Sequence, residues 1–227
     1  LQDARAKRAA RFDLSLAEEL ALGAAFLLLL NGYRGMYGEV PLLMAVGIVA
    51  ILVFMIHKTW RLLRDANVRA PFWQLKRAGR VTPAGALFAL VTTAFTLVGV
   101  QGLVMKVGEW VGDGSYLTLN ATRDQVFAAN YAPAPEVKAR AEAARAWYRL
   151  SAGVGDGGVG FFTSWGINVR LSWLSAVAGD WPEAERYLRA ALAQRPRADL
   201  AFDLATMMSR RGAPDADVRA MLSEVLR

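Results

Sequence analysis

Three apolar stretches dominate the first half of this chain of 227 residues and constrain its fold more than any other feature. They are Leu14–Leu30, Val40–His57 and Val81–Met105, and the third contains no charged residue. A helix that crosses a bilayer needs about 20 mainly apolar residues to span roughly 30 Å of hydrocarbon. We therefore expect a membrane domain over residues 14–107 with about three transmembrane helices.

The first stretch is interrupted by Glu18 and Glu19, which leave only Leu20–Leu30 as an unbroken apolar run. We interpret it as a spanning helix, and the alternative is a tilted or re-entrant segment that packs against the second stretch. The basic segment 1–13 favours a cytoplasmic N-terminus and so supports the span. The sequence begins with Leu1 rather than methionine, which leaves open a missing N-terminal piece.

The segment between the last two stretches, residues 58–80, is strongly basic, because seven Lys and Arg residues oppose the single Asp65. Short loops rich in Lys and Arg remain in the cytoplasm, so everything after Lys106 is expected on the opposite side. Basic segments beside a membrane also attract anionic lipid headgroups. The residues expected to contact those headgroups are Lys58, Arg61, Arg64, Arg69, Lys76, Arg77 and Arg80.

Composition limits the remaining classes of function. The chain is 55% hydrophobic with a net charge of +7, which indicates a protein that is part membrane and part water-soluble. Most of the charge lies in the basic segment, where topology explains it, so nucleic-acid binding is not expected. With no cysteine and the single histidine His57, the chain lacks the ligands for iron–sulfur clusters, thiolate zinc sites or a bis-histidine haem, and no cofactor is expected.

Beyond the third stretch the pattern becomes polar, and residues 108–131 are interpreted as a juxtamembrane connector. A helical segment follows over Glu136–Ser151, and the glycine-rich break Gly153–Gly160 ends it. The break contains a G-x-G-x-x-G spacing, but a dinucleotide site needs those glycines after a strand and before a helix. We therefore interpret it as a loop between helices.

The segment Asn168–Pro196 carries the most informative pattern of the second half. Gly179 and Asp180 separate two helical runs, and Pro196 ends the second. This segment resembles one tetratricopeptide repeat, although Asn168 and Ser172 depart from the family's usual tryptophan and small residue. The matching positions are Gly179, Asp180, Trp181, Ala184, Leu188, Ala191, Leu192 and Pro196, and a degenerate second unit is expected over Asp199–Arg227.

One repeat cannot bury its hydrophobic face alone, so the neighbouring helices are expected to pack on it and form an all-α helical-repeat domain over residues 132–227. The alternative is a generic helical bundle without a peptide groove. The resemblance implies that partner proteins bind the face made by the first helices. On this chain that face comprises Val169, Trp173, Ala176, Asp203, Met207 and Arg210.

No pair of carboxylates, nucleophile or metal-ligand set stands out, which favours a function other than catalysis. We expect a membrane-anchored accessory or scaffold subunit of a larger respiratory or photosynthetic complex in a bacterial inner membrane, with the C-terminal domain periplasmic. Its partners would be other membrane subunits and anionic lipids. The alternative is a cofactor-free membrane module of a larger redox protein. The chain faintly resembles such modules in the order of its parts: a hydrophobic hairpin, a basic loop that contains Leu75–Arg80, another span and a repeat-like tail.

Overall fold

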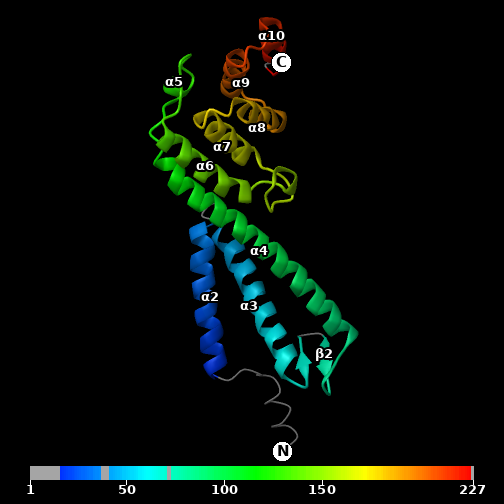
Figure 1. Cartoon of the computed structure of the whole chain (residues 1–227). Helices are drawn as coiled ribbons and strands as arrows, with labels where there is room; N and C mark the ends of the chain where they lie inside the picture. Colours follow the sequence, from blue (N-terminus) through cyan, green and yellow to red (C-terminus); the bar gives the residue numbers. More distant parts are fainter. Residues whose placement is uncertain (1–15, 37–40, 71–72, 226–227) are drawn as a thin grey trace, which may run out of the picture. The chain divides into compact units, whose positions relative to one another are not determined.

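The computed structural model describes residues 16–36, 41–70 and 73–225. The basic segment 1–13, expected in the cytoplasm, therefore lies outside the described residues. Over the described ranges the chain forms nine α-helices, one short 3-10 helix and a three-stranded sheet (Figure 1). The expected, mainly α-helical fold is confirmed. The chain divides into two compact units, Leu1–Leu97 and Val98–Arg227, and each is described by itself.

In the first unit, α2 (Leu16–Met36) packs beside α3 (Leu42–Arg64), and α4 (Pro83–Leu117) begins within this unit and ends in the second (Figure 1). Few side chains of α3 and of the apolar part of α4 are buried. Several large aliphatic residues on these helices are exposed. Among these exposed residues are Leu43, Ile51, Leu63, Leu87, Leu90 and Leu97.

Within the described residues, two helices are long and apolar enough to cross a membrane, α3 and α4. The expectation of three spans is therefore corrected to two candidates. The helix α2, which covers the first apolar stretch from Leu16 onward, is not a candidate. Charged side chains at both of its ends, Glu18 and Glu19 in the first turn and Arg34 in the last, shorten its uncharged part.

The basic segment between α3 and α4 folds into a small antiparallel sheet that the sequence analysis did not predict. Its strands are β1 (Val68–Arg69), β2 (Gln74–Arg77) and β3 (Arg80–Val81), in the order β1-β2-β3. Ala78 and Gly79 join β2 to β3 with positive φ angles of 47° and 78°, as in the tight hairpin turns that match strand twist. The sheet is anchored by a small buried cluster of Leu62, Val68 and Leu75.

In the second unit the helices from α6 to α10 form a succession in which each packs on the next (Figure 1). The pairs α7 with α8 and α9 with α10 turn sharply at Gly179 and Gly212, whose φ angles are 82° and 78°. Glycine adopts this left-handed conformation without steric cost. The bounds are α5 (Arg123–Val126), α6 (Pro135–Leu150), η1 (Val154–Asp156), α7 (Trp165–Val177), α8 (Trp181–Gln194), α9 (Ala198–Arg210) and α10 (Asp215–Val225).

Local sequence signals explain where α7 and α8 begin. The side chain of Ser164 accepts a hydrogen bond from the Ile167 N–H, and Asp180 accepts one from the Glu183 N–H. Such caps satisfy donors that the first turn of a helix leaves unpaired. These helix bounds agree with the two runs that the sequence predicted around Gly179.

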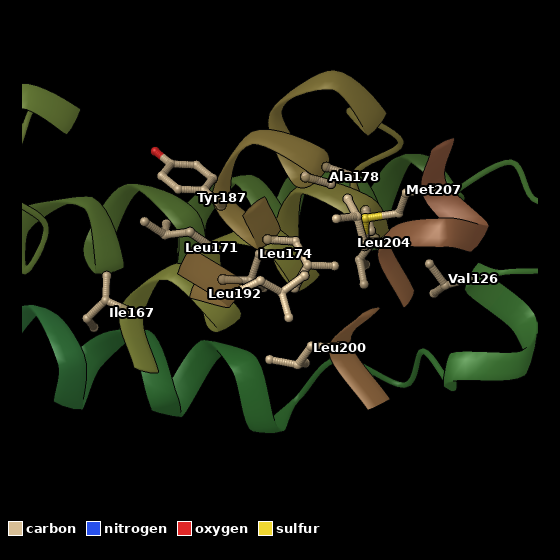
Figure 2. Close-up of a cluster of buried hydrophobic side chains, with 14 of the residues drawn as sticks. Val126, Ile167, Leu171, Leu174, Ala178, Tyr187, Leu192, Leu200, Leu204 and Met207 are labelled. Atoms are coloured by element: carbon tan, nitrogen blue, oxygen red, sulfur yellow. The ribbon is translucent and has the colours of Figure 1, made fainter. Parts of the chain in front are cut away.

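One hydrophobic core joins the helices of the second unit (Figure 2). Ala184 is fully buried where α7 meets α8, and its carbonyl accepts a 2.7 Å hydrogen bond from the hydroxyl of Ser172. This bond explains how a polar residue is accommodated there. The labelled core residues of Figure 2 are Val126, Ile167, Leu171, Leu174, Ala178, Tyr187, Leu192, Leu200, Leu204 and Met207.

The helix α4 continues past the apolar stretch to Leu117, so the first part of the expected connector is helical. Gly108 and Gly112 lie one turn apart and allow α6 to approach closely. A side chain at Gly108 would come within 2.7 Å of the Trp147 carbonyl oxygen, and one at Gly112 within 3.0 Å of the Tyr148 ring. This close packing attaches the stacked helices α6 to α10, which we call the helical array, to α4 within the second unit.

Candidate partner-binding surface

The six residues predicted to bind a partner lie on two helices of the second unit. Val169, Trp173 and Ala176 belong to α7, while Asp203, Met207 and Arg210 belong to α9. Ala176 and Met207 are buried in the core, and the other four are partly exposed. The structure thus places all six on neighbouring parts of one array, but only four present surface.

A segment of the same chain covers much of this face. Residues 119–131, which we call the strap, include α5 and connect α4 to α6. Val126 of the strap is fully buried in the core of the array. The ring of Phe127 lies 6.3 Å from both the Trp173 and the Trp181 rings, within the range of favourable aromatic pairs.

Polar contacts also hold the strap in place. The Arg210 guanidinium donates hydrogen bonds of 2.8 Å to the carbonyl oxygens of Val126 and Ala129. Arg123 forms an ion pair with Asp203, whose carboxyl has a pKa raised by burial in spite of that pairing. The guanidinium of Arg210 therefore binds the main-chain carbonyls of the strap, as a groove binds the main chain of a peptide.

The hydroxyl of Tyr131 completes these contacts with a 2.8 Å hydrogen bond to the Val177 carbonyl. Three of the six predicted residues, Trp173, Asp203 and Arg210, thus contact the strap directly. Whether they also bind an external partner stays a prediction. The contact residues of the strap were missed by the sequence analysis, and the available signals were the isolated aromatics Phe127 and Tyr131 and the helix cap at Thr122.

The end of the predicted partner-binding face near Val169 forms a cavity of about 530 Å³, lined by α4 and the start of α7. This volume lies within the usual range for ligand pockets. Both signs of charge are present, since Glu109 pairs with Lys106 at 2.6 Å and Arg170 with Asp113 at 3.4 Å. The lining residues are Glu109, Tyr116, Ser164, Trp165, Gly166, Ile167, Val169 and Arg170.

The indole N–H of Trp165 is buried and has no hydrogen-bond partner in the part of the chain that the structure describes. An unpaired buried donor is costly, and because this nitrogen has no exposed surface, a molecule in the cavity does not reach it. The residues Trp165 and Tyr116 give the cavity an aromatic lining. The cavity can therefore take an apolar side chain.

The residues predicted to contact lipid headgroups gather around the small sheet of the first unit, which we call the basic cap, residues 58–81. Arg64, Arg69, Arg77 and Arg80 are exposed. The others are partly buried and include Arg61, which pairs with Asp65 at 2.6 Å, and Lys76, whose ammonium donates to the Leu62 carbonyl at 2.8 Å. Lys58 belongs to this partly buried group.

Two exposed tryptophans accompany these cations. The Arg64 guanidinium carbon lies over the Trp60 ring, 5.6 Å from the ring centre. Trp73 lies just before β2 and is also exposed. Tryptophan is enriched where protein meets the membrane–water interface. The cap therefore combines fixed positive charge with amphipathic rings on one ordered element.

Carboxylates of the helical array are held by arginines. Glu183 pairs with Arg145 and Arg149, and Glu185 pairs with Arg189 and Arg211. Within the described ranges no group of three His, Cys, Asp or Glu residues could hold a metal ion. Comparisons of the chain with protein-family models, with curated proteins and with solved structures found no match.

Proposed function

We propose that this protein is a membrane-anchored accessory or scaffold subunit. In this proposal α3 and α4 cross a bacterial inner membrane, and the helical array holds a partner protein on the non-cytoplasmic side. The observation that carries the proposal is the exposed apolar surface of two long helices on the same chain as a well-packed helical array. Apolar surface of that extent is stable in lipid and not in water.

The length of α4 supports the same arrangement. Its 35 residues correspond to about 52 Å of helix at 1.5 Å per residue, which exceeds the roughly 30 Å of a bilayer core. The excess emerges beyond Met105 and provides Gly108 and Gly112 as the contact for α6. The helical array is therefore attached to the part of α4 that leaves the membrane.

Charge sets the proposed orientation. The basic cap stays in the cytoplasm because cationic segments beside a span resist transfer. Its exposed arginines Arg64, Arg69, Arg77 and Arg80 contact anionic headgroups of the cytoplasmic leaflet, where each basic residue contributes on the order of 1 kcal/mol. The end of α4, and the helical array with it, then lies on the periplasmic side.

The partner site in this proposal is the open cavity at Val169. The strap already fills the rest of the predicted face, so an external segment would have access to Tyr116, Trp165 and Arg170. An apolar side chain of another membrane subunit fits there, against Tyr116 and Trp165. The arrangement calls for binding and needs no reacting group.

Photo-crosslinking in native membranes tests this site. Tyr116 is replaced by benzoylphenylalanine in the full chain, and the matched control carries the same replacement at Phe202, an exposed aromatic on α9. We expect a discrete covalent adduct with one partner subunit from position 116 and none from position 202. Equal labelling at both positions, or none at position 116, would contradict the proposed site.

Removing residues 132–227 tests the broader role. If the helical array holds a partner, that partner is lost from the complex purified in mild detergent while the two spans remain in the membrane. Unchanged composition and activity of the complex would rule out the scaffold function.

A further inference from the structure

The loop between α6 and α7, residues 153–163, exposes three large apolar side chains. We call it the glycine loop. The exposed fractions are 71% for Val154, 79% for Phe161 and 74% for Phe162. Adjacent exposed phenylalanines are unusual on a water-soluble surface, and clustered exposed apolar residues mark a contact surface.

The exposure is built into an ordered loop. Gly153 bridges to Gly160, and the Gly153 N–H donates a 2.9 Å hydrogen bond to the hydroxyl of Thr163. That hydroxyl in turn bonds Asp156, which accepts a 2.6 Å bond from Arg186 of α8. The loop is therefore tied at both ends and at its middle, and its apolar side chains are held outward.

The glycines of this loop have a structural use. A side chain at Gly158 would overlap the carbonyl oxygens of Ala152 and Arg149, and one at Gly153 would come within 2.9 Å of the Phe162 main chain. Two glycines of the G-x-G-x-x-G spacing therefore reflect close folding of the loop on itself, while Gly155 meets open space. The side chains of Phe161 and Phe162 are exposed and take no part in this folding.

The glycine loop lies beside the end of the apolar stretch of α4, within the second unit. α6 runs along α4 in the direction of the proposed span, and the loop extends this contact by a further turn. Three hydrogen bonds follow this contact toward the apolar stretch. The Tyr148 hydroxyl donates to Asp113, the Ser151 hydroxyl donates to the Met105 carbonyl, and the Gln101 amide donates to the Val159 carbonyl.

We propose that the glycine loop is an interfacial membrane anchor, in which Val154, Phe161 and Phe162 enter the boundary between headgroups and acyl chains of the periplasmic leaflet. The inference rests on the proposed crossing by α4, because the loop lies against the last residues of its apolar stretch: the Val159 carbonyl accepts from the Gln101 amide, and Gly160 lies beside the Met105 side chain. Apolar residues held at that level lie about 5–10 Å deep in an interface, as in membrane-surface helices.

A further aromatic residue supports the proposed depth of the loop at the membrane interface. Trp110 on α4 is exposed and follows Met105 by little more than one turn, where interfacial tryptophans are expected. The glycine loop and α4 would then hold the helical array to the membrane at two points. Two points fix its orientation, which a single helix alone would leave free to rotate.

Fluorescence quenching by lipid tests the anchor in the full chain, which has no native cysteine. Val154→Cys is labelled with an environment-sensitive dye and reconstituted into vesicles whose acyl chains carry bromine. Leu97→Cys on α4 is the control for the span, and Ala190→Cys on α8 is the control for a water-exposed position; both native residues are exposed. We expect a blue shift and quenching at positions 154 and 97, and neither at position 190.

The outcomes separate the two proposals. Quenching at position 97 without quenching at position 154 overturns the anchor and keeps the span, whereas no quenching at position 97 overturns the span itself. Adding Phe161→Ser and Phe162→Ser to the Val154→Cys variant should abolish its quenching. Quenching that survives both serines would show that the dye, and not the loop, enters the lipid, and would also overturn the anchor.

Discussion

Gly85 is the position where one added methyl group should most clearly disrupt the basic cap. It lies at the start of α4, directly against the main chain of β2. A side chain there would overlap the Leu75 carbonyl oxygen and come within 2.8 Å of the Leu75 carbonyl carbon. Main-chain atoms cannot rotate away, so Gly85→Ala must separate β2 from α4.

The cost follows from the bonds at that junction. The Thr82 N–H donates a 3.0 Å hydrogen bond to the Leu75 carbonyl, and the Thr82 hydroxyl donates one of 2.5 Å to the Gln74 carbonyl. Losing these two bonds to β2 costs about 2 kcal/mol, and the better helix propensity of alanine returns about 1 kcal/mol. The net loss in cap stability is about 1 kcal/mol.

Limited trypsin digestion in detergent measures this loss, because the exposed Arg77 and Arg80 lie in paired strands and become cleavable when the cap opens. When cleavage follows the open population, about 1 kcal/mol corresponds to cleavage faster by on the order of 5-fold. Gly99→Ala in the same helix meets open space and should leave the rate unchanged. Equal rates for both variants would refute the reasoning.

Three further predictions concern the helical array. Ala184→Leu overpacks a fully buried contact at a cost of about 1–3 kcal/mol and should lower the melting temperature by several degrees; an unchanged melting curve would show that the site is not packed. Arg210→Ala removes two bonds to the strap and should speed hydrogen exchange of residues 126–131, which Arg211→Ala should not. The hydrogen bond from the Thr163 hydroxyl lowers the pKa of Asp156. The stabilisation that this bond gives the loop of residues 153–163 is therefore complete above the unfolded pKa of about 3.9 and is lost as pH falls through the lower folded pKa, so hydrogen exchange of the loop should speed up there, and an Asp156→Asn variant should lack that acid step.

The parts of the fold that follow from local pattern were predicted from the sequence. The charge-free stretch Val81–Met105 specified α4, and Gly179 with Asp180 located the turn between α7 and α8. Periodicity and turn residues act over a few positions, so the sequence displays them directly. The expected number of about three spans was too high for the described residues, where α3 and α4 are the two candidates. Charges at both ends of α2, in the first apolar stretch, shorten its uncharged part.

The parts that depend on distant contacts were not predicted. The strands of the basic cap are two to four residues long, too short for alternation to appear. Each of β1 and β2 contributes one buried residue, Val68 and Leu75, among many cations. The strap contacts join residues far apart in the chain, such as Arg123 with Asp203. No local pattern records such a pairing, so the face predicted for a partner was not recognised as one that the chain itself covers.

The orientation of α4 is the central claim, and labelling of introduced cysteines tests it most directly. Arg77→Cys in the basic cap and Ala190→Cys on α8 replace exposed residues of a chain without native cysteine. A membrane-impermeant maleimide added to intact spheroplasts should label position 190 at once and position 77 only after permeabilisation. Labelling of both positions from the same side would contradict the crossing by α4, and labelling of position 77 alone would reverse the orientation.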